Sequence, residues 1–152
     1  MTKATITTLC LAFIFFCIGC TTTAPSGREM GRWVRNAHIP IPIPAIKNGN
    51  TEITRLAILE GLTIRRGASW QLENESTGYI TTRLDYRGSS VTIKIEYNDS
   101  EARLKYLQGN NNYACSDIDD GVCYDADRAY YSHVSRLRKN ITRQIKIQYK
   151  NR

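Results

Sequence analysis

Cys115 and Cys123 are two thiols whose spacing fits a short disulfide loop. An oxidising compartment favours such a bond, and closing a loop of this length contributes about 2–3 kcal/mol to stability. Two thiols can also bind a metal, but this pair lacks CxxC spacing and neither histidine lies near it in the sequence. We therefore expect a disulfide between Cys115 and Cys123 and no metal site.

Cys20 follows an apolar segment, and its thiol is a candidate for acylation. Lys3 precedes an uncharged run over residues 4–19, which is too short to span a bilayer comfortably. A basic start, an apolar middle and a small residue before the cleavage point are typical of a secretory signal peptide, and a Cys directly after Ile18-Gly19 resembles a bacterial lipobox. Cys17 stands where a lipobox usually has Leu, so cleavage elsewhere and an uncleaved anchor stay open as alternatives.

The start of the chain therefore predicts a location. Residues 1–19 are expected to be a lipoprotein signal peptide, and Cys20 to carry acyl chains such as palmitate that attach the protein to a membrane. Thr21 stands where Asp would favour the inner membrane, so we expect the outer membrane of a bacterial cell envelope, with the domain facing the periplasm or the exterior. Export also takes the chain away from nucleic acid, despite a net charge of +7.

An acidic loop surrounds the second cysteine of the pair. Clustered carboxylates can bind calcium, but the EF-hand spacing fails because Gly121 comes one position early and Arg128 stands where the bidentate Glu is needed. We expect a solvated loop, held by the disulfide, that faces the start of the last helix. Its aspartates are Asp117, Asp119, Asp120, Asp125 and Asp127.

The two histidines give no catalytic pattern. His38 falls in a predicted tether and His133 lies beside Val134 in a predicted helix, and neither accompanies a Ser or Cys nucleophile at a recognised motif. A phosphate-binding glycine loop is also missing from the sequence. We expect no catalytic residues, no cofactor and no enzymatic activity.

The last helix carries the candidate contact surface. Eight basic residues and no acidic residue lie between Arg128 and Arg152. Helical spacing predicts one basic stripe that meets anionic lipid, lipopolysaccharide phosphates or an acidic envelope protein. The alternative is a solvated outer face that keeps a small domain soluble. The stripe comprises Arg136, Lys139, Arg143 and Lys146.

Residues 20–49 are expected to form a lipidated tether. The alternation of Ile and Pro over residues 38–44 disfavours helix and favours an extended, polyproline-like run. Its isoleucines would either pack along the surface of the domain or form an edge that a partner protein binds. Trp33, flanked by Arg32 and Arg35, fits the lipid headgroup level or a packed site on the domain equally well.

Residues 50–152 are expected to form one α+β domain. A helix begins at Asn50 or Thr51 and ends at Gly61, and strand patterns follow over residues 63–72, 79–87, 91–97 and 102–106. Turn residues at 74–78, 88–90 and 98–99 make these strands an antiparallel meander. The last helix shows an apolar stripe that packs on one sheet face, which predicts a two-layer sandwich. The stripe comprises Tyr130, Val134, Leu137, Ile141 and Ile145.

Core and turn positions over residues 52–145 resemble a family of small uncharacterised proteobacterial envelope lipoproteins. The pattern includes Ala57-Ile58-x-x-Gly61-Leu62, Trp70, Gly78-Tyr79-Ile80-x-x-Arg83-Leu84, Val91-x-Ile93-x-Ile95-x-Tyr97, Lys105-Tyr106 and Tyr131-x-x-Val134-x-x-Leu137-x-x-x-Ile141. The resemblance implies this fold and an envelope location, and it implies no reaction. The chain departs from the family pattern by its two loop cysteines and the Asn-rich turn before them.

These features favour a membrane-anchored, non-enzymatic docking or assembly factor of the envelope. Its N-terminal lipid would contact the membrane, and its basic stripe would contact anionic lipid or an acidic envelope protein. The alternative is a periplasmic ligand- or ion-binding module, or an enzyme inhibitor, that uses the disulfide loop.

Overall fold

The computed structural model of this chain describes residues 27–45, 51–64 and 69–150. The predicted signal peptide and Cys20 lie outside these ranges. No helix within them is long and apolar enough to cross a bilayer. The elements are α1 (Arg32–His38), β1 (Ile41–Pro42), α2 (Thr51–Thr63), β2 (Trp70–Ser76), β3 (Tyr79–Tyr86), β4 (Ser89–Tyr97), β5 (Glu101–Gly109), the short 3-10 helix η1 (Asn111–Tyr113), β6 (Ile118–Asp119), β7 (Val122–Cys123) and α3 (Arg128–Lys150).

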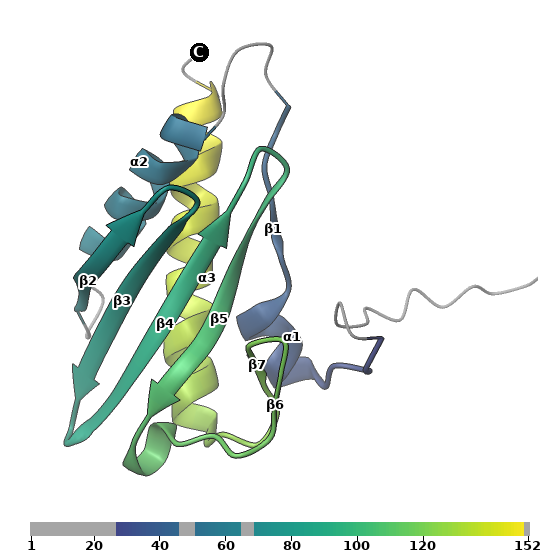
Figure 1. The fold of residues 1–152 in the computed structure, drawn as a ribbon, viewed down its shortest axis with the longest axis vertical. Coiled ribbons are helices and arrows are strands. Elements are labelled where there is room, and N and C mark those ends of the chain that lie inside the picture. The colour runs from purple at the N-terminus through teal and green to yellow at the C-terminus, as the bar shows by residue number, and fades with distance from the viewer. Residues whose placement is uncertain (1–26, 46–50, 65–68, 151–152) are drawn as a thin grey trace, which may run out of the picture.

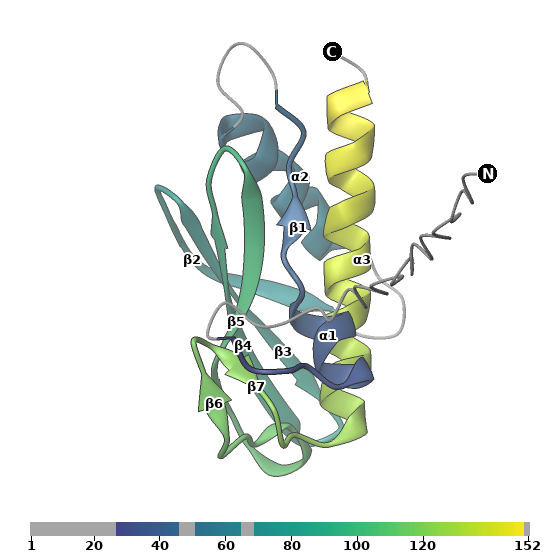
Figure 2. The same ribbon diagram turned by 90° about the vertical axis from the view of Figure 1, so that its right-hand side faces the viewer.

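An antiparallel sheet forms one layer of the molecule, and α2 and α3 form the other (Figures 1 and 2). The strand order is β1-β5-β4-β3-β2, so β2 to β5 are the predicted meander and β1 is a fifth strand at its edge. The predicted α+β sandwich, with the C-terminal helix packed on one sheet face, is therefore confirmed with five strands instead of four.

Strands β3, β4 and β5 form where the sequence alternates between apolar and polar residues. Every second side chain along these strands points to the helices. Ile80, Ile93 and Ile95 are of this kind, and each has no exposed surface. Arg87 and Gly88 both have positive φ, at 51° and 77°, which is the backbone of a tight two-residue hairpin turn between β3 and β4.

Strand β2 begins later and ends later than the sequence predicts. Helix α2 continues to Thr63, and β2 follows only at Trp70, with a bulge between Leu72 and Asn74. The turn predicted over residues 74–78 is reduced to two residues, because Gly78 takes a φ of 82° that lets the chain reverse at once. The predicted strand start at residue 63 and the five-residue turn are therefore wrong.

Gly61 lies inside α2 and does not end it. A Cβ atom built on Gly61 would lie 2.8 Å from Ile141 Cγ1 and 3.0 Å from Ile141 Cα, so the missing side chain lets α2 and α3 approach closely. The buried stripe of α3 then fills the space between α2 and the sheet. Its predicted residues, from Tyr130 to Ile145, are at most 1% exposed.

The structure corrects the predicted tether, because residues 30–43 belong to the folded domain. Ile41 pairs with Ala102 of β5, and the Ile-Pro alternation turns both isoleucines inward while Pro42 faces out. Proline is tolerated at such an edge because no partner strand needs its missing N–H group. In Figure 2, α1 and β1 lie along the seam between the sheet and α3. The buried residues of this segment are Met30, Val34, Ala37, Ile41 and Ile43.

His38 fastens this segment to the core. Its Nδ1–H donates to the Leu104 carbonyl at 3.0 Å, and its Nε2 accepts from the Tyr130 hydroxyl at 3.0 Å. Burial lowers the pKa of His38 to about 4, although the Leu104 carbonyl acts in the opposite direction. The ring is therefore neutral at pH 7.

We expect acid to destabilise the domain through His38. The unfolded chain binds a proton on this ring near pH 6.5 and the folded chain only near pH 4, so stability is full above pH 6.5 and falls as the pH drops through this window. The free energy of unfolding, measured by urea denaturation, should fall by about 2 kcal/mol between pH 7 and pH 4.5. His38→Gln should remove most of this slope, and an unchanged slope in that variant would contradict the assignment.

Candidate functional site

The predicted disulfide between Cys115 and Cys123 is present. It closes a loop that contains the β6–β7 hairpin, and this hairpin lies beside the lower end of β5 in Figure 1. The Tyr106 N–H group of β5 donates to the Gly121 carbonyl at 2.7 Å. The loop, β1 and His38 thus cover successive positions along one edge of β5, where unpaired backbone groups would otherwise invite aggregation.

Most carboxylates of the acidic loop already have structural partners. Asp125 accepts hydrogen bonds from the backbone N–H groups of Ser116 and Asp117 at 3.0 Å, and the Ser116 hydroxyl is the main cause of its lowered pKa. Asp120 binds Lys105 at 2.8 Å, and Asp127 accepts from the Ala129 N–H group at the start of α3. These contacts favour a structural role for the loop over an ion-binding one.

Cys115, Cys123 and Asp125 form the one group of potential metal ligands within the described ranges, but the disulfide occupies both sulfurs. The loop also holds the start of the domain. Arg28 makes two hydrogen bonds to the Asp117 carboxylate, at 2.9 and 2.8 Å, and lies over the Tyr124 ring at 3.9 Å.

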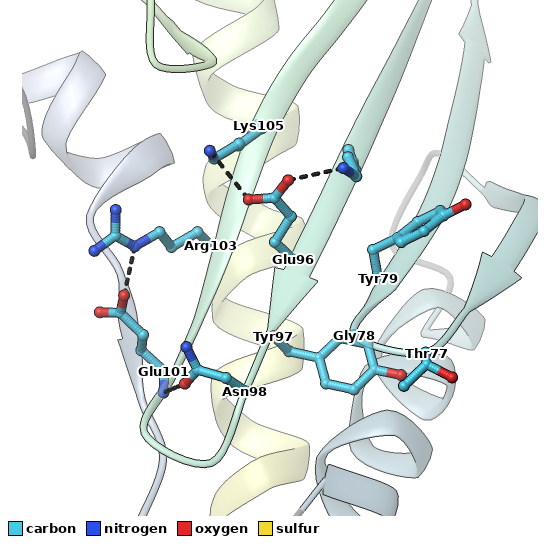
Figure 3. Close-up of a pocket in the computed structure, with 10 residues that line it drawn as sticks. Thr77, Gly78, Tyr79, Glu96, Tyr97, Asn98, Glu101, Arg103 and Lys105 are labelled. Carbon is cyan, nitrogen blue, oxygen red and sulfur yellow. Dashed lines mark hydrogen bonds and ion pairs between the residues drawn. The ribbon is translucent and has the colours of Figure 1, made fainter.

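The outer face of the sheet carries a polar hollow of about 400 Å³ (Figure 3). Its charges balance one another: Glu96 lies between Lys94 at 2.8 Å and Lys105 at 3.0 Å, and Arg103 binds Glu101 at 2.5 Å. A face whose cations are already paired has little electrostatic preference for a charged ligand.

The predicted basic stripe lies on the side of α3 that faces away from the core. Its four side chains are all exposed, and none takes part in an ion pair among residues 27–45, 51–64 and 69–150. Arg138 differs, because its Nε–H donates to the Ile39 carbonyl at 2.7 Å and holds the end of α1. We call Arg136, Lys139, Arg143 and Lys146 the basic face.

Two residues of the basic face also line a hollow of about 340 Å³, which we call the α3 groove. The end of α2, the start of β2 and the middle of α3 form its walls. Among the residues that the structure describes, the lining contains no carboxylate, in contrast to the hollow on the sheet. The lining residues are Ile64, Trp70, His133, Arg136, Leu137, Lys139 and Asn140.

His133 forms the floor of this groove. Its side of the helix turns inward, so the residue is only 8% exposed, and its ring packs against Tyr86 and Tyr113 at centroid distances of 5.0 and 5.8 Å. Burial, and secondarily the charge of Arg136, lower the pKa of His133. Neither ring nitrogen has a hydrogen-bond partner in the described part of the chain.

Trp33 is partly packed on the domain and partly exposed, so the structure excludes neither the packed site nor contact with lipid headgroups. The residue is 44% exposed, and the Arg128 guanidinium lies over its ring at 4.6 Å from the centroid. The residue therefore joins α1 to the start of α3 and still shows part of its surface.

The sequence identified the cations of this region but missed the groove. Trp70 falls in the strand pattern over residues 63–72 and His133 in the predicted last helix, and no local pattern connects the two positions. The only available signal was that His133, Arg136 and Asn140 share one helix side at spacings of three and four residues. Comparison with models of protein families, with curated proteins and with solved structures finds no match to this chain.

Proposed function

We propose that this chain is a non-enzymatic, lipid-anchored docking domain of the bacterial cell envelope, whose basic face lies on an anionic membrane surface. One observation carries the docking role: four exposed cations share one side of α3, and none has an acidic partner among the described residues. The sequence supplies the anchor, because Cys20 follows a signal-like segment. The resemblance to envelope lipoproteins supports the same location.

Electrostatics make a membrane a suitable partner for this face. A Lys or Arg near an anionic bilayer contributes about 1 kcal/mol, and the attraction falls off within a Debye length of about 8 Å at physiological salt. All four cations must therefore approach the surface together. Their positions on a single straight helix allow this.

The docking role predicts binding of the unlipidated protein to anionic vesicles. The mature chain over residues 20–152 with Cys20→Ser should co-sediment with vesicles that contain anionic lipid and not with purely zwitterionic ones. Replacing all four cations of the basic face by Gln should weaken this binding at least tenfold, because each lost cation removes part of an additive attraction.

A matched control removes four positive charges from the other side of the molecule, by Arg83→Gln, Arg87→Gln, Lys94→Gln and Lys105→Gln. Binding should change less than threefold in this variant, since three of these cations are already paired with carboxylates. Equal losses in the two variants would mean that net charge alone drives binding. Capture of an acidic envelope protein, without vesicle binding, would replace the membrane by a protein partner.

A further inference from the structure

We propose that the α3 groove is a binding site for a phosphate monoester that carries an apolar group. Arg136 and Lys139 would hold the phosphate, His133 and Asn140 would donate hydrogen bonds to it, and Trp70 would contact the apolar part. This inference goes beyond the proposed docking role and does not depend on it.

The polar lining of the groove is rich in hydrogen-bond donors. The Arg136 guanidinium can bind two phosphate oxygens at once, and the Lys139 ammonium adds a compact charge. The Asn140 amide and a neutral imidazole each supply further N–H donors. Since the described lining residues include no carboxylate, none of them repels an anion or neutralises the two cations.

His133 brings a hydrogen-bonding ring to the groove. It is a polar side chain, more than nine-tenths buried, that lines the groove without a hydrogen-bond partner in the described residues. The rings of Tyr86 and Tyr113 pack against its imidazole, and among the described residues only the Tyr124 hydroxyl, and neither nitrogen of this ring, is a fully buried unpaired atom. A ring nitrogen that lines the groove and has no protein partner can donate its N–H group to a ligand oxygen.

Apolar side chains also line the groove, and this apolar wall would contact the group esterified to the phosphate. Ile64 and Leu137 lie there with the partly buried indole of Trp70. A bare inorganic anion would leave this wall exposed to water, whereas an ester group would cover it. The geometry therefore favours an aryl or diacylglyceryl phosphate monoester over free phosphate.

The test is an NMR titration of the mature chain over residues 20–152 with Cys20→Ser. Three probes are compared: phenyl phosphate as a soluble ester, dihexanoyl phosphatidic acid as a lipid headgroup, and inorganic phosphate. At least one ester should bind saturably and at least tenfold more tightly than inorganic phosphate, with shifts at the Trp70 indole and the His133 imidazole. The bound anion should also raise the pKa of His133, because a nearby negative charge favours the imidazolium form. The ester that binds more tightly indicates the source of the ligand.

Two variants with equal charge loss separate the groove from the rest of the basic face. Arg136→Gln with Lys139→Gln should weaken ester binding at least tenfold, whereas Arg143→Gln with Lys146→Gln should change it less than twofold. His133→Gln should weaken it as well, without change in vesicle binding. Equal losses in the two pairs, or no saturable shift with any probe, would overturn the site while leaving vesicle docking intact. Equal affinity for inorganic phosphate would overturn the role of the apolar wall.

Discussion

A chain that begins at residue 46 should fail to fold, whereas a chain that begins at Arg28 should fold fully. The missing segment buries Met30, Val34, Ile41 and Ile43 in the core, and burial of each such side chain contributes about 1.5–3 kcal/mol before the cost of ordering the chain. A typical domain has only about 5–15 kcal/mol of stability in total. Truncation would also expose the edge of β5 along β1 and remove the hydrogen bond from His38 to Leu104.

Circular dichroism, urea denaturation and gel filtration of the two truncations would measure this effect. A point variant tests the same contact within the whole mature chain: Ile41→Ala should cost about 2–5 kcal/mol, since Ile41 has no exposed surface. Pro42→Ala is the matched control on the exposed side of β1 and should change stability by less than about 0.5 kcal/mol. A stable domain from residue 46 would restore the tether that the sequence predicts.

Cys20→Ser should abolish acylation and leave the signal peptide uncleaved, because cleavage at a lipobox follows modification of the thiol. Serine lacks the thiol that the acylating enzymes modify, and stable anchoring needs more than one acyl chain. Cells grown with a clickable palmitate analogue should label the native chain and not this variant.

Cys17→Leu is the matched control for this substitution. It supplies the residue that a lipobox usually has at that position, so labelling should persist or increase. Persistent labelling of Cys20→Ser would instead show that acylation takes place elsewhere, and the anchored part of the proposed function would then be wrong.

Alternation and helical spacing predicted the elements that bury a continuous face. Ile80, Ile93 and Ile95 repeat every second residue, and the stripe of α3 repeats every third or fourth, so a local pattern was sufficient there. The disulfide followed from the spacing of two thiols. The exposure of the basic face followed from its place opposite the buried stripe.

The elements that the sequence missed depend on distant contacts. Helix α1 has only seven residues, too few for a periodic signal, and β1 has two, one of them a proline. Gly61 looked like a helix end because glycine is a poor helix former, yet the approach of Ile141 from another helix gives it its role. The partners of His38 lie 66 and 92 residues away along the chain.

The ion pair between Arg28 and Asp117 limits how far an anchored domain could travel. Arg28 is eight residues after Cys20, a stretch that spans at most about 28 Å when fully extended. Helix α3 alone, with its 23 residues, is about 35 Å long. A lipid on Cys20 would therefore confine the molecule to a layer about as deep as the domain itself. Its partners would then have to reside in, or come to, the same leaflet, because a domain anchored in this way could not extend across the periplasm to meet them.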